Sequence, residues 1–361
     1  MNLHLLSEYS SHNLGDAVIY ETLAQLAAPL VVRSRMAPGE RRHARGLQGA
    51  VPSTPTDAWL SVGGDVFNNA RPALLTRRFA CQLLQLAVAP PARCFAFGQS
   101  VPASCRGLAF GLLARAMRRL AGVTVRDEAS HQRLREAGVA AELSWDIAFA
   151  YRPVGAALPA ACQLLEQAGV DPARCVLISV REFDAMYPHD NERFVTRIAE
   201  LCRLLRGRGH QPALLLQADA AGSDSDRRVA ARIGARVADL PVIDPFAAAP
   251  HGHPVDALLG LLALARGAVA VRYHTAVLRL LAGLVPYSLH YSVKGRDLAR
   301  RLRLPGTDLD DLDPAAAIAG IEASFERDHD PWAQHAHVTQ AFGAQLAQAL
   351  GEAVAYPVST R

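Results

Sequence analysis

The feature that most constrains the fold is a regular alternation of short apolar runs with longer segments of helical periodicity. Leu3–Ser7, Ala58–Val62 and Cys94–Phe97 are apolar runs of strand length, and each precedes a segment with apolar residues three or four apart. Strands and helices that take turns along a chain indicate a parallel sheet covered by helices on both faces. The sequence therefore predicts an α/β protein built from doubly wound, Rossmann-like sheets.

The alternation lapses between about Ala148 and Arg174, in a stretch that holds three prolines and two glycines. We interpret this stretch as a linker between an N-terminal domain, residues 1–155, and a C-terminal domain, residues 170–330. A length of 361 residues fits two domains of ordinary size. The helical pattern from Pro331 to Ala353 predicts a tail, residues 331–361, that packs back on the N-terminal domain. Ligands of two such domains in series usually bind in the cleft between them.

Composition argues against several classes of function. The net charge of +4 comes without a dense Lys/Arg run, so nucleic acid is not an expected partner. Apolar runs such as Ala257–Ala265 and Ala276–Leu284 are well short of the roughly 20 residues that span a bilayer. The N-terminus has no signal-peptide pattern, and the six cysteines lack metal-ligand spacing. We predict a cytoplasmic protein whose cysteines are buried free thiols, with no metal site.

The most informative residues follow strands of the C-terminal half. Arg181 ends the strand that begins at Val176, and Arg272 and His274 follow the strand Ala268–Val271 at the start of a helix. A helix N-terminus already favours an anion, and these side chains add a bidentate cation and a titratable proton donor. His274 acting only as a helix cap is the alternative. The pattern predicts a phosphate or carboxylate site.

Two more residues follow the next strand, Val285–His290. They are Tyr291 and Lys294, the single lysine of a chain in which arginine supplies every other basic side chain. An accidental surface lysine is the alternative interpretation. Because the carboxyl ends of parallel strands meet at one edge of a sheet, we expect Arg181, Arg272 and Lys294 to be directed at one place.

Polar loops also follow the strands of the N-terminal half. Paired glycines with a carboxylate and amides suit a loop that approaches sugar hydroxyls closely, although helix capping and turn chemistry explain part of the pattern. The candidate acceptor-binding residues are Asn13, Asp16, Asp65, Asn68 and Gln99. Asp146 ends a later strand and is a candidate base or a cap. Arg126 and Asp127 are interpreted as an ion pair at a helix start.

These residues, in this order, resemble the polysaccharide pyruvyl transferase family. The resemblance runs from Asn13-Leu14-Gly15-Asp16 through Gly63-Gly64-Asp65, Gly98-Gln99-Ser100, Arg126-Asp127 with Ser130, Asp146, Ser179 with Arg181, and Arg272 with His274, to Tyr291 and Lys294. It implies two Rossmann-like domains in a GT-B-like arrangement with the active site in the interdomain cleft. It also implies transfer of pyruvate from phosphoenolpyruvate to a sugar, with formation of a cyclic ketal and release of phosphate.

The resemblance and the chemistry suggest roles for the candidate residues. Arg181, Arg272 and Lys294, with Tyr291, would bind the two anionic groups of phosphoenolpyruvate, and His274 would donate a proton or hold the departing phosphate. Asp65 or Asp146 would act as the base toward the sugar. The expected co-substrate is phosphoenolpyruvate, and no cofactor is required. The acceptor is a sugar of a glycan or its precursor. A lipid-linked acceptor would bring the protein to the inner face of the membrane, so peripheral membrane association stays open.

Two other functions fit part of the pattern. A GT-B glycosyltransferase that uses a nucleotide sugar would place a pyrophosphate against the same C-terminal cations. A non-catalytic sugar- or phosphate-binding protein of the same fold would need the cations but no proton-transfer residues. The absence of GxSxG, HExxH, P-loop and GxGxxG patterns argues against the enzyme classes that those motifs mark.

Overall fold

The computed structural model divides the chain into two compact units. It describes residues 1–69, 74–155, 157–184, 186–219, 225–248 and 252–351. Unit 1 comprises residues 1–11, 16–152 and 332–361, and unit 2 comprises residues 12–15 and 153–331. Apart from the short excursion of residues 12–15, the chain passes from unit 1 to unit 2 after Arg152 and returns at Trp332.

Unit 1 is built on a seven-stranded sheet in the order β3-β2-β1-β4-β5-β6-β7, and every pairing in it is parallel. Its strands are β1 (Asn2–Leu6), β2 (Val31–Ser34), β3 (Leu47–Gly49), β4 (Ala58–Ser61), β5 (Cys94–Gln99), β6 (Gly122–Val125) and β7 (Ala141–Leu143). Its helices are α1 (Leu14–Ala27, whose first two residues group with unit 2), α2 (Arg77–Val88), α3 (Gly107–Met117), α4 (Glu128–Glu136) and α12 (Trp332–Leu350). The helix predicted over 72–87 begins only at Arg77, and residues 70–73 lie outside the described residues.

Unit 2 contains a six-stranded sheet in the order β10-β9-β8-β11-β12-β13, again parallel throughout. Its strands are β8 (Cys175–Ser179), β9 (Gln211–Leu215), β10 (Val242–Ile243), β11 (Gly267–Ala270), β12 (Tyr287–His290) and β13 (Gly306–Asp308). Its helices are α5 (Ala157–Gln167), α6 (Asn191–Gly207), α7 (Asp226–Gly234), α8 (Pro254–Leu264), α9 (Tyr273–Leu281), α10 (Val293–Leu302) and α11 (Pro314–Ser324).

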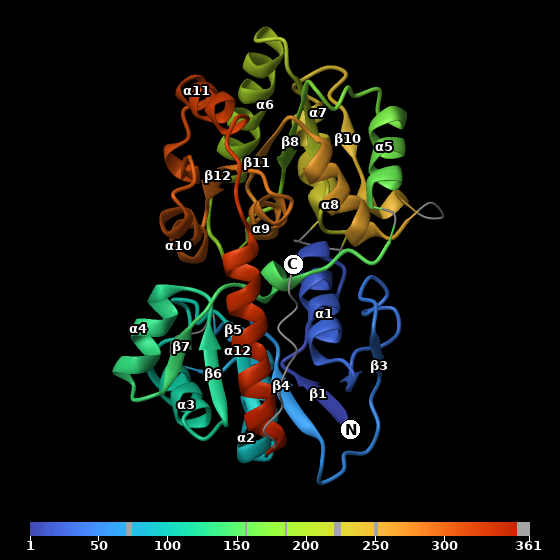
Figure 1. Cartoon of the computed structure of the whole chain (residues 1–361). Coiled ribbons are helices and arrows are strands. Elements are labelled where there is room, and N and C mark those ends of the chain that lie inside the picture. The colour runs from blue at the N-terminus through green and yellow to red at the C-terminus, as the bar shows by residue number, and fades with distance from the viewer. Residues whose placement is uncertain (70–73, 156, 185, 220–224, 249–251, 352–361) are drawn as a thin grey trace. The chain divides into compact units, whose positions relative to one another are not determined.

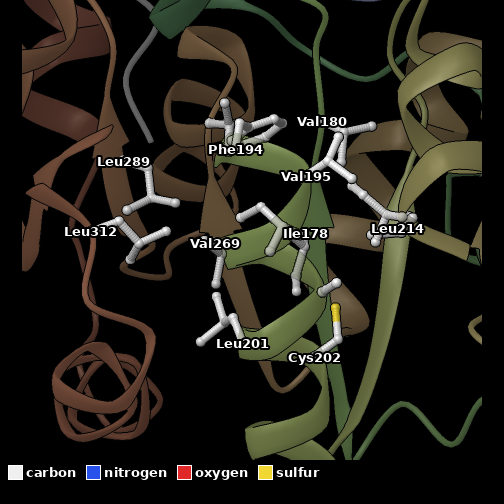
Figure 2. Packing of buried hydrophobic residues seen from close by; sticks show 14 of the residues in the cluster. Ile178, Val180, Phe194, Val195, Leu201, Cys202, Leu214, Val269, Leu289 and Leu312 are labelled. Carbon is white, nitrogen blue, oxygen red and sulfur yellow. The ribbon is translucent and has the colours of Figure 1, made fainter. Parts of the chain in front are cut away.

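A core of aliphatic side chains joins the sheet of unit 2 to helices α6, α7 and α11. Figure 2 shows Ile178, Val269 and Leu289 of three adjacent strands beside Val195 and the Cys202 thiol of α6. These strands are buried throughout or nearly so, which explains why they appear in the sequence as continuous apolar runs. The predicted α/β class with two parallel sheets is confirmed.

The stretch that we interpreted as a linker contains a helix. α5 begins two residues after Gly155 and packs along α8, where Gly260 lies so close that a Cβ there would lie 2.3 Å from the Ala157 carbonyl oxygen. Pro159 is in the first turn of α5, where a proline removes no helical hydrogen bond. The prolines and glycines therefore mark helix ends here rather than an irregular segment.

The last helix, α12, packs against β4, β5 and β6 of unit 1 (Figure 1, red). Phe342 on this helix meets Phe95 and Phe97 of β5 edge to face, with ring centroids 5.8 and 5.3 Å apart. Gly122 of β6 leaves space for Gln345, whose side chain would lie 2.8 Å from a Cβ at that position. Residues far apart in the sequence thus complete one core.

The cysteines are all free, but they do not share one environment. Burial raises the pKa of the Cys94, Cys175 and Cys202 thiols to about 12, so these thiols are unreactive at neutral pH. Cys81 on α2 and Cys162 on α5 are exposed, so the prediction that every cysteine is buried was wrong for these two. Both lie on amphipathic helices, where buried positions recur every three or four residues and the positions between them face solvent.

No helix among the described residues is both long enough and apolar enough to cross a bilayer.

Candidate active site

The cationic residues of unit 2 follow three neighbouring strands. Arg181 lies two residues beyond β8, Arg272 follows β11, and Tyr291 and Lys294 follow β12. β11 lies between β8 and β12 in the sheet, so these residues occupy adjacent positions at the carboxyl edge. The predicted convergence of three strand ends is thus a direct result of the strand order.

Arg181 is buried among aromatic rings, with only 9% of its surface exposed. Its guanidinium carbon lies 4.6 Å from the ring centre of Tyr291 and 5.0 Å from that of Tyr187. Its Nη1 also donates to the Tyr291 hydroxyl at 2.7 Å. Aromatic faces attract a cation through the ring quadrupole, so they hold the guanidinium in place without cancelling its formal charge.

Lys294 lies in a similar environment at the first turn of α10. Its ammonium nitrogen is 5.8 Å from the ring centre of Tyr187 and 5.5 Å from that of Tyr273. Tyr187 therefore contacts both cations. His274 is the neighbour of Tyr273, and the two rings meet edge to face at 5.3 Å. Arg181, Tyr187, Lys294, Tyr273 and His274, together with Tyr291, form what we call the cation–tyrosine cluster.

Arg272 pairs with a buried carboxylate. Its Nη2 donates to Oδ1 of Asp226 at 2.5 Å, and its Nε bonds the same carboxylate at 3.1 Å. Asp226 is fully buried, and its Oδ2 also accepts from the backbone N–H groups of Gln217 and Ala218. We had expected Arg272 to present its charge to a ligand. The structure shows instead that this guanidinium joins α7 to the end of β11.

The segment before α1 lies in unit 2, close to His274. A Cβ at Gly15 would lie 2.2 Å from Nδ1 of His274, so only glycine fits here without displacement of the imidazole. Asn13 accepts the Gly15 N–H at 3.0 Å, and the Leu14 N–H donates to the Gln217 carbonyl at 2.8 Å. The side chain of Asn13 therefore caps α1, which is the alternative that the sequence left open.

A second cluster lies in unit 1 and centres on Arg126, which follows β6. Its Nη1 donates to Asp146 at 2.5 Å, its Nη2 to Asp65 at 3.4 Å and its Nε to the Ser100 hydroxyl at 2.8 Å. Asp65 follows β4, Ser100 follows β5 and Asp146 follows β7. These strands are neighbours in the sheet, so four adjacent strand ends contribute to what we call the Arg126 cluster.

The two carboxylates of the Arg126 cluster are held differently. Asp146 is 1% exposed, and its Oδ1 also accepts the Ala148 N–H at 2.9 Å, so both oxygens have bonds that fix them. The side chain of Asp65 is 11% exposed and meets Arg126 at the longer distance of 3.4 Å. Asp65 is therefore the more accessible of the two proposed bases.

The prediction of an ion pair between Arg126 and Asp127 was wrong. Asp127 caps α4 by accepting the Ser130 N–H at 2.8 Å and the Ser130 hydroxyl at 3.0 Å. Consecutive residues at the end of a strand point in opposite directions, so Arg126 turns toward Asp146 and Asp127 turns toward the helix.

The remaining acceptor candidates have partners within unit 1. The Gln99 amide is fully buried and donates to the Val62 carbonyl at 2.7 Å and to the Ser61 carbonyl at 3.0 Å, so it ties β5 to β4 rather than facing solvent. Asn68 accepts the Ser104 hydroxyl at 2.5 Å and remains partly exposed. Asp16, in the first turn of α1, is partly exposed as well.

Tyr9 is a site residue that no sequence pattern indicated. Its hydroxyl donates to the Gly63 carbonyl oxygen, and a Cβ at Gly64 would lie 2.6 Å from this hydroxyl. Burial raises its pKa well above the usual range, and the carboxylate of Asp16 acts in the same direction, so the phenol stays protonated. Gly64 therefore leaves space for this tyrosine, whereas Gly63 packs against the backbone carbonyl groups of Phe97 and Gly98. Its position in a loop after β1, without any local motif, offered no signal.

The pattern also gave no indication of Tyr187 or Asp226. Tyr187 lies in a segment without sequence periodicity, whereas Asp226 lies in the predicted helix Asp224–Ile233. Their contacts with Lys294 and Arg272 join residues far apart in the chain. For Arg126 the signal was present, since a basic residue follows β6 where a strand end was predicted.

Comparison with known proteins identifies the family. The family model of polysaccharide pyruvyl transferases matches residues 13–283, which is most of the chain. The match includes the Arg126 cluster and all of the cation–tyrosine cluster except Tyr291 and Lys294. A comparison with curated proteins gave no match. Solved structures with the same fold include UDP-GlcNAc 2-epimerase from Methanocaldococcus jannaschii, with a TM-score of 0.57 and 10% identity over 95% of this chain and 99% of that one.

Two other solved structures are similar. The S. aureus MnaA–UDP structure has a TM-score of 0.59 at 10% identity and covers 100% of this chain and 99% of that one. An α,α-trehalose 6-phosphate synthase from Burkholderia multivorans has a TM-score of 0.51 at 16% identity and covers 83% and 73%. At these identities the likeness concerns the fold, which is that of GT-B glycosyltransferases and epimerases. The match over residues 13–283, with the residues of both clusters inside it or directly after it, shows that the chain belongs to the polysaccharide pyruvyl transferase family.

Proposed function

We propose that this transferase moves pyruvate from phosphoenolpyruvate to two hydroxyls of a sugar and releases phosphate. In this reaction the enol carbon gains a proton, and the central carbon forms two C–O bonds to the sugar while its bond to the phosphate oxygen breaks. One hydroxyl proton ends on the new methyl group and the other on the departing phosphate. The product is a cyclic ketal that retains the carboxylate of pyruvate.

The observation that best supports this donor is the cation–tyrosine cluster. Phosphoenolpyruvate carries two anionic groups, a carboxylate and a phosphate. Arg181 and Lys294 supply two cations, and both of them contact the ring of Tyr187. Arg181 suits planar, bidentate binding of the carboxylate, whereas Lys294 suits a phosphate oxygen as a point charge. Arg272, fixed by Asp226, would hold the start of α9, which carries His274, in place.

His274 is the proposed proton donor. It lies at the N-terminal turn of α9, where backbone N–H groups and the helix dipole favour an anion. An imidazolium there would protonate the enol carbon or stabilise the departing phosphate. Gly15 packs against its Nδ1 and would fix the orientation of the ring.

We propose that unit 1 binds the acceptor and that Asp65 is the base. Asp65 is more exposed than Asp146 and more weakly held by Arg126, so it can receive a hydroxyl proton with less loss of existing bonds. Asp146 would then position Arg126. Asp16 and Asn68 remain candidates for contacts with sugar hydroxyls. These roles call for acid–base groups, and phosphoenolpyruvate serves as co-substrate without a further cofactor.

The donor assignment is tested by ligand-induced thermal stabilisation, which needs no acceptor. Phosphoenolpyruvate should raise the melting temperature of the wild type, whereas UDP and GDP should not. Arg181→Met should weaken phosphoenolpyruvate binding about 10- to 100-fold, since one charge-assisted contact contributes about 1.5–3 kcal/mol. A second variant, His274→Ala, is used in the turnover test below. Its matched control is His337→Ala, which removes an exposed histidine of α12. Stabilisation by UDP alone would favour a nucleotide-sugar donor instead.

Turnover is tested by phosphate release from phosphoenolpyruvate in the presence of candidate sugars. His274→Ala should lower the rate at least about 100-fold, because a positioned general acid contributes about 10²–10⁴. Asp65→Asn should abolish turnover while leaving phosphoenolpyruvate binding intact. A His274→Ala rate within a few-fold of the wild type would contradict the mechanism. Binding of phosphoenolpyruvate without turnover on any sugar would favour the non-catalytic alternative.

A further inference from the structure

An open groove of about 560 Å³ runs along α10 beside β13, the edge strand of the unit 2 sheet. It is lined by Arg296, Arg300 and Arg303 from the helix side and by His290 and Asp308 from the ends of two strands. None of these residues belongs to the cation–tyrosine cluster. Lys294, on the same helix, contacts the rings of that cluster instead.

Two of the arginines share one face of the helix, and the third follows its end. Arg296 and Arg300 are four residues apart on α10, with the exposed Val293 one turn before them. Arg303 caps the helix and lines the same groove. The segment 293–308 carries five basic and two acidic residues in a chain whose net charge is only +4. A large part of the excess positive charge is therefore concentrated beside this groove.

Arg303 occupies a backbone conformation that favours glycine. It ends α10 with φ of 51°, in the left-handed region, where glycine is the usual residue at a helix end. An arginine there strains the backbone by about 1 kcal/mol, whereas glycine would end the helix equally well without this strain. The side chain that it contributes lines the groove.

The acidic residue of the groove does not neutralise it. Asp308 pairs with Nε of Arg296 at 2.5 Å, and Arg300 pairs with Asp297 at 3.1 Å while 61% of its side chain stays exposed. Burial lowers the pKa of His290, although Asp308 opposes the shift, so the imidazole is neutral at pH 7. Even with Asp297 counted beside Asp308, the segment 293–308 has five basic residues against two acidic ones, so the helix side of the groove is cationic.

We propose that this groove is a second anion site, separate from the donor site, that binds a phosphate or diphosphate group. Guanidinium groups in a row can each donate two parallel hydrogen bonds to phosphate oxygens, and an open groove admits a phosphate that is attached to a larger molecule. Both a soluble phosphate compound and the headgroup of an anionic lipid offer this chemistry. The inference does not depend on pyruvyl transfer.

The test titrates the full-length protein with inorganic pyrophosphate by calorimetry at low ionic strength. Arg300→Gln combined with Arg303→Gln should weaken binding by at least about tenfold. Arg77→Gln with Arg78→Gln removes the same charge from exposed positions of α2 and should change affinity less than twofold. Arg303→Gly should also weaken binding while keeping or raising the melting temperature, since it relieves the left-handed backbone. Equal affinity in the wild type and both groove variants would overturn the proposal.

Pyrophosphate could also bind at the cation–tyrosine cluster, so the titration is repeated in Arg181→Met. Binding that persists there and disappears with the groove arginines assigns it to the groove. Binding that disappears in Arg181→Met alone would refute the second site. Cosedimentation with phosphatidylglycerol vesicles, with phosphatidylcholine vesicles as reference, identifies the source. Vesicle binding lost in Arg300→Gln with Arg303→Gln indicates a lipid phosphate, whereas pyrophosphate binding without vesicle binding indicates a soluble ligand.

Discussion

Arg126 in unit 1 and Arg181 in unit 2 are both buried arginines at strand ends, yet their surroundings are of opposite kinds. Arg126 bonds two carboxylates and a hydroxyl. Arg181 lies over tyrosine and phenylalanine rings and donates to a phenol. Carboxylates bring an opposite formal charge to a guanidinium, whereas aromatic rings attract it through their quadrupole. The proposed donor role of Arg181 uses this difference, since a guanidinium held by rings can also bind an anionic ligand.

The largest expected effect is the loss of stability in Arg126→Met. Removing the guanidinium leaves the buried Asp146 without its main partner, which costs about 3–5 kcal/mol. All three tryptophans, Trp59, Trp145 and Trp332, lie in unit 1, so their fluorescence during urea unfolding reports on this unit. Arg181→Met should leave that transition unchanged. Equal unfolding midpoints for Arg126→Met and the wild type would remove the contrast between the two arginines.

A smaller effect is expected at Tyr187, whose ring contacts both Arg181 and Lys294. Tyr187→Leu should weaken phosphoenolpyruvate binding about three- to tenfold, since each cation–π contact contributes about 0.5–1 kcal/mol. Tyr187→Phe keeps the ring and should bind within twofold of the wild type. If Phe and Leu behave alike, the hydroxyl rather than the ring positions the two cations.

The smallest expected effect is a pH dependence at His335 of α12, which accepts from Nε of Arg152 at 3.4 Å. Burial lowers the pKa of this imidazole, and the nearby Arg152 acts in the same direction. A histidine whose pKa is depressed in the folded state contributes stability above about pH 6.5, and this stability is lost as the pH falls toward the lowered value.

Urea midpoints from tryptophan fluorescence at pH 7.5 and pH 5.5 measure this loss. The difference between the two midpoints should be larger in the wild type than in His335→Gln. Other carboxylates and histidines contribute equally to both proteins, so the comparison isolates His335. An identical difference in the two proteins would show that this residue titrates alike in the folded and unfolded states.

The strand ends could be predicted because they depend on local patterns. Val176–Val180 and Ala268–Val271 are apolar runs that end in a charged residue, and buried parallel strands produce this pattern. The short edge strands β3, β10 and β13 were not predicted, because two or three residues are too few to show the alternation of apolar and polar residues that indicates a strand. The helix α5 was not predicted because its proline and flanking glycines resemble loop signals.

Partners of the site residues could not be predicted from the sequence in the same way. The pattern placed Arg272 at a strand end, but its bond to Asp226 depends on how α7 packs against the sheet. Gln99 was likewise predicted as a loop residue, but its amide donates hydrogen bonds to the carbonyl groups of Ser61 and Val62 at the end of β4. A sequence pattern indicates where a side chain begins, and only the packed structure shows which group it meets.

The return of α12 to unit 1 has a consequence for the order in which the molecule is made. When the ribosome has synthesised residues 1–331, the segments of unit 2 are complete, but the sheet of unit 1 still lacks the helix that carries Phe342. The apolar surface of β5 around Phe95 and Phe97 can then be covered only after α12 has been synthesised. During that interval the first unit to emerge is the last to finish folding, and it is the natural client for a chaperone that binds exposed aromatic surface.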